Sequence, residues 1–155
     1  MVLWIFLDSA LFETLSRDIT ISIWRDGYSL EIALFHIIGV ATALKYKMEK
    51  NQKELFIIML FAISYLFYFL EESLLLSIVY PFVISYYNVV ILQTIMKKDI
   101  KTISIYMIAI GWMASGAGLF IALESLILFV PILFLLALLK VLNSQQTNKK
   151  ELHYA

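Results

Sequence analysis

The stretch SLEIALFHIIGVATALKYK, residues 29–47, decides the fold. Between Glu31 and Lys45 it carries no charged side chain, and most of its residues are apolar. A helix that spans a lipid bilayer needs about 20 predominantly apolar residues. The stretch therefore predicts a transmembrane helix, although one histidine, His36, lies well inside it.

The composition of the whole chain supports a membrane protein. Of its 155 residues, 62% are hydrophobic and 15% are charged, whereas soluble domains are about 45–50% apolar and about 25% charged. The chain has no cysteine, which excludes disulfides, cysteine-ligated zinc, iron–sulfur clusters and thiol catalysis. The length predicts a single domain over residues 1–155.

The pattern predicts an all-α integral membrane protein with a five-helix, up-down transmembrane bundle at residues 28–142. The five spans are predicted at residues 28–46, 55–70, 74–96, 103–123 and 126–142. Their links are so short that neighbouring helices must be adjacent and antiparallel. We detect no internal repeat in the sequence.

Lysines in alternate links predict the orientation of this bundle. They are Lys45, Lys47, Lys50 and Lys53 after the first span, Lys97, Lys98 and Lys101 after the third, and Lys140, Lys149 and Lys150 at or after the end of the fifth. Basic links of membrane proteins face the cytoplasm. We therefore expect a multi-pass protein of the cell membrane, with its N-terminus outside and a cytoplasmic polar tail at residues 143–155.

Residues 1–27 differ from the predicted spans. In MVLWIFLDSALFETLSRD, residues 1–18, helical spacing places Trp4, Leu7 and Leu11 on one side, and Asp8 interrupts that apolar side. This pattern predicts an amphipathic helix that lies in the outer membrane interface. In residues 19–24 an isoleucine stands at every second position, a period of two, so we expect an extended segment that covers the outer mouth of the bundle with the helix.

The histidine in the first span has two interpretations. His36 shares a helix face with Gly39, a small residue that favours contact with another helix, so its ring is expected inside the bundle. It is either a neutral structural residue or a proton carrier or ligand. The expected hydrogen-bond partners on the second and third spans are Ser64, Tyr65, Tyr68, Tyr87 and Asn88.

The sequence yields one candidate polar site within the membrane. It consists of His36, Tyr68, Glu72, Tyr87 and Asn88. Ionisable groups in membrane spans often mark a path for ions or protons. We predict no cofactor, and His36 is the one weak candidate ligand; a haem held by this histidine and a methionine stays open as an alternative.

The fourth predicted span is rich in small residues. Gly111 and Ser115 are four residues apart, and Gly118 follows on the next turn. Together with Gly39, they predict close helix packing. The contact is expected within the bundle, with another subunit, or with a cofactor or solute.

The function predicted from the sequence rests largely on missing motifs. The sequence shows no phosphate-binding loop, metalloprotease motif or nucleophile elbow, which favours a protein that is not an enzyme, with no catalytic residue and no metal site. The separated lysine clusters form no nucleic-acid surface. We expect a non-catalytic accessory subunit of a larger respiratory or transport complex. The alternative is a small homo-oligomeric transporter or channel with its polar site around His36 and Glu72.

Overall fold

The structure is a computed structural model that describes residues 1–25, 27–137 and 139. The described residues form helices and connecting loops, and none of them forms a strand. The predicted polar tail, residues 143–155, lies outside the described residues. The predicted all-helical class is confirmed for the part of the chain that is described.

The helices follow one another with short links. The first four are α1 (Val2–Arg17), α2 (Ser29–Lys45), α3 (Lys50–Phe69) and α4 (Ser73–Ile95). Next come α5 (Ile100–Ile108), the π-helix η1 (Ala109–Ala114) and α6 (Ser115–Leu123), which together form one continuous helix. The 3-10 helix η2 (Leu126–Phe129) opens the last apolar helix, Leu126–Ala137.

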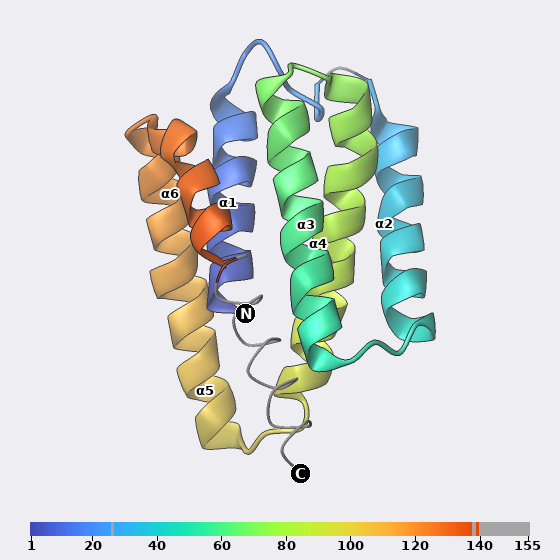
Figure 1. The fold of residues 1–155 in the computed structure, drawn as a ribbon, viewed down its shortest axis with the longest axis vertical. Helices are drawn as coiled ribbons and strands as arrows, with labels where there is room; N and C mark the ends of the chain where they lie inside the picture. The colour runs from blue at the N-terminus through green and yellow to red at the C-terminus, as the bar shows by residue number, and fades with distance from the viewer. Residues whose placement is uncertain (26, 138, 140–155) are drawn as a thin grey trace.

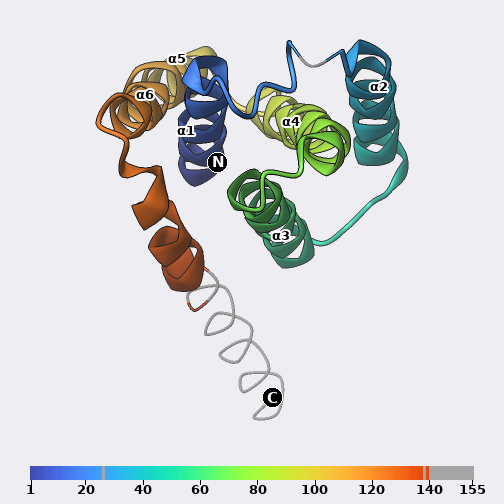
Figure 2. The ribbon, with the colours of Figure 1, turned by 90° about the horizontal axis from the view of Figure 1, so that it is seen from above.

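The helices stand side by side and alternate in direction (Figure 1). Seen along the bundle, the α5–α6 helix, α1, α4 and α2 form a row, while α3 and Leu126–Ala137 lie on one side of that row (Figure 2). In the most apolar stretch of α4, half of the residues are buried. In the corresponding stretch of the helix Ile100–Leu123, 17% are buried. The centre of the packing is therefore α4, and the α5–α6 helix lies at the edge.

Within the part of the chain that the structure describes, three helices are long and apolar enough to cross a membrane: Lys50–Phe69, Ser73–Ile95 and Ile100–Leu123. The opening stretch forms α2, which has 17 residues. The helix Leu126–Ala137 is apolar but shorter, as far as it is described. The bundle is thus supported as a membrane fold, whereas the predicted count of five spans is not confirmed.

The position of α1 differs from the one expected from the sequence. Instead of lying across the end of the bundle, α1 stands upright within it and packs against α6, η1 and α3 (Figures 1 and 2). Its residues Leu7, Leu11 and Leu15 are fully buried. The apolar side of α1 is thus covered by protein, where Asp8 finds partners, and α1 does not form the expected cover over the end of the bundle.

The segment after α1, unlike α1 itself, covers an end of the bundle. Its residues Ile21 and Ile23 are buried. Trp24 packs on Phe12 of α1 and on Tyr80 of α4, with ring centroids 5.7 and 6.5 Å apart. The segment forms turns rather than a strand, and it closes the gap between α1 and α4 at that end.

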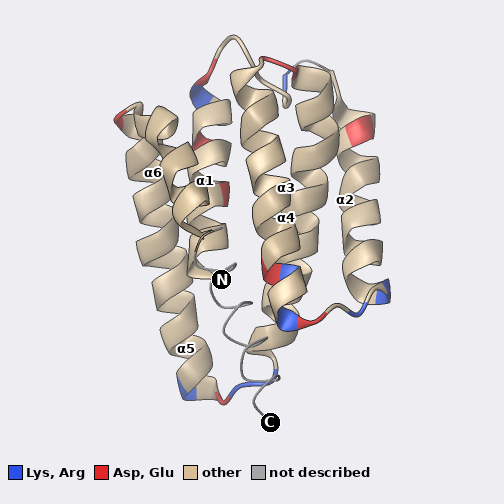
Figure 3. Ribbon diagram, in the orientation of Figure 1, with Lys and Arg blue, Asp and Glu red and all other residues tan. Residues whose placement is uncertain are grey.

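Most charged residues lie near the two ends of the bundle (Figure 3). We call the end with the α2–α3 and α4–α5 links the lysine-rich end, and the other the opposite end. Met1 lines a cavity with Lys50 and Lys53. The start of α1 therefore lies at the lysine-rich end, whereas the sequence prediction placed it at the opposite end.

Candidate functional site

The central polar feature of the bundle is Asp8, near the middle of α1. One carboxylate oxygen, Oδ1, accepts a hydrogen bond from the Tyr80 hydroxyl at 2.8 Å. The other, Oδ2, accepts one from the Tyr87 hydroxyl at 2.5 Å. Tyr80 also donates to the Asp8 main-chain carbonyl at 3.1 Å. Two tyrosines of one helix thus bind both oxygens of the carboxylate.

The sequence spacing of α4 explains this geometry. Tyr80 and Tyr87 are seven residues apart, close to two helical turns, so both project from the same face. Both side chains are almost completely buried, with 0% and 1% exposed. From α3, the buried Tyr65 donates to the carbonyl oxygen of Leu7 at 2.8 Å. Three tyrosines from two helices therefore hold the turn of α1 that carries Asp8.

The groups around Asp8 are polar but neutral. Among the described residues, the one ion pair joins Arg17 to Glu13 at 3.7 Å, away from this site. Asp8 itself is only partly buried. A charged carboxylate in a low-dielectric interior is costly, and a bound proton or cation removes that cost. The arrangement can hold a carboxyl group that exchanges a proton.

One of the predicted polar residues belongs to this site. Tyr87 binds Asp8 directly. Asn88, the next residue of α4, is exposed on the surface of the bundle. The structure therefore places Tyr87 at Asp8 and leaves Asn88 outside this hydrogen-bond network.

His36 lies elsewhere, at the contact between α2 and α4. Its Nδ1 atom is 2.6 Å from the Ser85 hydroxyl, and the side chain is partly buried. Its partner is on α4, one of the two helices in which we expected it. Ser85 is not among the five partners predicted from the sequence. Whether the histidine has a chemical role stays a prediction.

Tyr68 and Glu72 lie at the opposite end of the bundle. The Tyr68 hydroxyl donates to Oδ2 of Asp18 at 3.0 Å, while Glu72 is exposed at the start of α4. Burial alone would raise the pKa of the Asp18 carboxyl, but hydrogen bonds from Thr20 and Tyr68 outweigh it and hold the pKa below its usual value. The five predicted residues therefore do not form a single site.

Two cavities of about 250 Å³ lie at the two ends. The cavity at the lysine-rich end is lined by Met1, Trp4, Lys50, Lys53, Glu54, Val90 and Thr94. The cavity at the opposite end is lined by Thr14, Arg17, Asp18, Tyr68, Ala122, Ser125 and Ile127. Both contain residues of α1, and Asp8 lies between the two sets along that helix.

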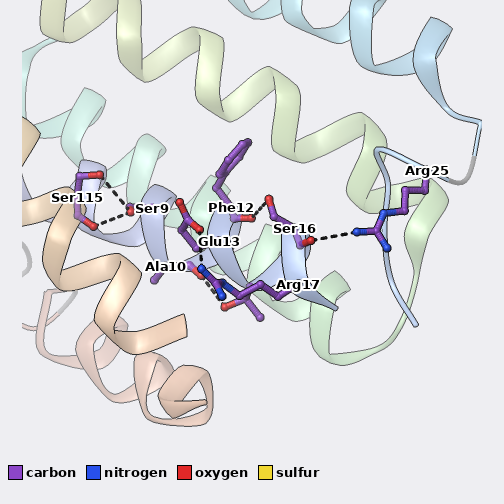
Figure 4. Close-up of polar contacts among 9 residues, drawn as sticks. Ser9, Ala10, Phe12, Glu13, Ser16, Arg17, Arg25 and Ser115 are labelled. Atoms are coloured by element: carbon purple, nitrogen blue, oxygen red, sulfur yellow. Dashed lines mark hydrogen bonds and ion pairs between the residues drawn. The ribbon is translucent and has the colours of Figure 1, made fainter. Parts of the chain in front are cut away.

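The predicted packing residues differ in their surroundings. A Cβ atom added to Gly118 would lie 2.6 Å from the Cβ of Ser9, and one added to Gly39 would lie 2.5 Å from the Phe82 carbonyl oxygen. A Cβ atom at Gly111 would meet nothing within 4 Å. Ser115 accepts a hydrogen bond from Ser9 at its carbonyl oxygen (Figure 4). Gly39, Ser115 and Gly118 thus lie at helix contacts, whereas Gly111 faces outward.

Sequence reasoning missed three residues of these sites: Asp8, Tyr80 and Ser85. The signal for Asp8 was present, because an acidic residue on an apolar helix side requires a polar partner.

Comparisons of the chain with models of known families, with curated proteins and with solved structures found no match.

Proposed function

We propose that the protein is a small membrane transporter in which Asp8 takes up and releases a proton midway through the bundle. The observation that carries this proposal is the binding of both carboxylate oxygens by Tyr80 and Tyr87. Acidic groups within membrane bundles are costly, and they often mark proton relays and ion paths. The site favours Asp8, rather than His36 and Glu72, as the working residue.

The two tyrosines suit both protonation states of Asp8. A phenolic hydroxyl can donate or accept a hydrogen bond. When Asp8 is charged, Tyr80 and Tyr87 both donate to it. When Asp8 carries a proton, its hydroxyl can donate to one of the phenols while the other continues to donate. The same geometry thus stabilises the site before and after proton transfer.

We further infer that the lysine-rich end faces the cytoplasm, because basic links stay on that side of the membrane. The upright α1 then crosses the membrane as well. It places the start of the chain on the cytoplasmic side and gives six crossings in place of the five first expected. The lengths of α1 and α2, 16 and 17 residues, are close to the lower limit of about 17 for a spanning helix.

The test is proton movement by purified protein in sealed liposomes. A potassium diffusion potential supplies the driving force, and a trapped pH-sensitive dye records proton flux. We expect flux with the natural chain and its loss with Asp8→Asn, which keeps the size of the side chain and removes the titrating group. In infrared spectra of the same samples, a protonated-carboxyl band should titrate with pH and be missing from Asp8→Asn.

Asp99→Asn is the matched control. Asp99 is an exposed residue that caps α5 at the lysine-rich end, and asparagine keeps the ability to cap a helix. This variant should retain both the flux and the infrared band. Equal flux and equal spectra for the natural chain and Asp8→Asn would overturn the proposal.

A second candidate is a subunit of a larger complex or homo-oligomer. Asn88 is exposed on α4, where contact with lipid would leave its amide without partners. A Cβ atom added at Gly111 or Gly116 would meet nothing within 4 Å, so these glycines leave room for a helix of another subunit to pack closely. Purification in mild detergent separates the two candidates: stoichiometric unrelated subunits would favour the accessory role, and a homogeneous particle that moves protons would favour the transporter.

A further inference from the structure

The contact between α2 and α4 is built around one glycine and one hydroxyl. Gly39 lies against the main chain of Phe82 and the Cβ of Ser85. One helical turn earlier on α2, His36 bonds to the Ser85 hydroxyl. A single serine of α4 thus meets both residues of α2.

The contact between α6 and α1 repeats this construction. Gly118 lies against Ser9 and the main chain of Ala10. One turn earlier on α6, Ser115 accepts a hydrogen bond from the Ser9 hydroxyl at 2.8 Å (Figure 4). Gly118 follows Gly39 by 79 positions, as Ser115 follows His36, and Ser85 follows Ser9 by 76.

We infer that residues 1–69 and 73–137 are two inverted copies of one three-helix unit. In this arrangement α1 corresponds to α4, α2 to the α5–α6 helix, and α3 to Leu126–Ala137. Each unit has three helices, so the second enters the bundle from the end opposite to the first. The sequence Gly-x-x-x-Ala-Leu at residues 39–44 returns at residues 118–123, and Lys45 after the first is matched by Glu124 after the second. Opposite charges at these positions suit units of opposite orientation.

The two cavities follow the same correspondence. Val90 and Thr94 line the cavity at the lysine-rich end. Their counterparts, 76 positions earlier, are Thr14 and Asp18, which line the cavity at the opposite end. The cavities are therefore equivalent features of the two units. Asp8 lies between them, at the contact of the two corresponding helices α1 and α4.

Inverted repeats of this kind are common in secondary transporters, whose sites lie near the membrane midplane where the repeats meet. In such proteins, motion of one part against another opens the site to each side in turn. The two cavities are the access routes to Asp8 from the two sides of the membrane, and opening of one closes the other. This inference extends the proposed function, on which its assignment of Asp8 rests.

Two introduced cysteines test the alternation, since the chain has none of its own. Thr94→Cys reports on the lysine-rich end and Thr14→Cys on the opposite end. In oriented proteoliposomes, an impermeant maleimide is applied first from the lysine-rich side and a fluorescent one then from the other side. Occupation of Thr94→Cys should slow labelling of Thr14→Cys several-fold, and the reverse order should give the same result.

The control is Tyr46→Cys in place of Thr94→Cys, because Tyr46 is exposed at the lysine-rich end and does not line the cavity there. Its occupation should leave labelling of Thr14→Cys unchanged. Labelling rates that are independent in both orders would overturn the alternation. The reciprocal effect should persist in Asp8→Asn, so failure of the proton site and failure of the alternating cavities give different results.

Discussion

At the scale of single residues, the Asp8 site depends on hydroxyl groups that phenylalanine lacks. Tyr87→Phe removes the donor to Oδ2 while keeping the ring in its buried position. A net hydrogen bond contributes about 0.5–1.5 kcal/mol to stability. We expect Tyr87→Phe to lower the free energy of unfolding in detergent by that amount, and to reduce proton flux in the liposome assay.

The neighbouring Tyr86 supplies a matched control. It is also fully buried, but its hydroxyl makes only a weak contact of 3.6 Å to the sulfur of Met48. Tyr86→Phe should therefore leave proton flux unchanged. Equal flux losses in the two variants would show that the tyrosine rings, rather than the hydrogen bond to Asp8, determine the activity.

Asp18 predicts a pH dependence of stability at the opposite end. Its pKa is lowered from 3.8 in the folded protein, so the carboxylate stabilises the fold above that pH, and the contribution is lost as the pH falls through the folded-state pKa. Asp18→Asn should melt at a lower temperature than the natural chain at pH 7. The difference should shrink below about pH 4, where the carboxyl group takes up its proton. A difference that is constant with pH would contradict the role given to the charge.

Depth and residue type allowed part of the polar network to be predicted from the sequence. Tyr87 and Asn88 were singled out because polar groups inside a span need partners. The partner of Tyr87 was missed because α1 was placed outside the bundle. His36 was paired with larger polar groups, whereas Ser85, a residue common in any span, is its partner.

At the scale of helices, α1 shows the limit of the amphipathic pattern. An apolar side looks the same in the sequence whether it faces lipid at an interface or protein inside a bundle. Two residues of α1 indicate that its apolar side faces protein: Asp8 bonds to α4, and Ala10 lies in close contact with α6. Neither residue alone distinguishes a buried helix from an interfacial one, because their role depends on which helices pack against α1.

Gly118 tests the contact between α1 and α6. A larger side chain there would collide with Ser9 and the main chain of Ala10. Overpacking of this kind costs about 1–3 kcal/mol, so Gly118→Leu should lower the melting temperature in detergent. Gly116→Leu, two residues away on the same helix, adds the same group where nothing lies within 4 Å. It should melt like the natural chain, and a similar loss in both variants would point to a general effect on helix α6.

At the scale of the whole molecule, the sequence predicted a helical membrane bundle but not its internal symmetry. The two units keep few identical residues, because lipid-facing positions accept almost any apolar side chain. The two units share the glycines that allow close helix contact, Gly39 and Gly118. A search for overall sequence similarity therefore passes over the repeat that we infer from the helix contacts.

The position of the chain start distinguishes the two topologies most sharply. Val2 and Tyr46 are exposed near the lysine-rich end, at 46% and 56%, and Ile19 is exposed near the opposite end, at 86%. If α1 crosses the membrane, Val2→Cys and Tyr46→Cys should react with an impermeant maleimide from the cytoplasmic side, and Ile19→Cys from outside. If α1 lay in the outer interface, Val2→Cys and Ile19→Cys would react from the same side. We expect the first result because α1 packs upright between α6 and α3, and such packing requires its two ends to lie at the two ends of the bundle.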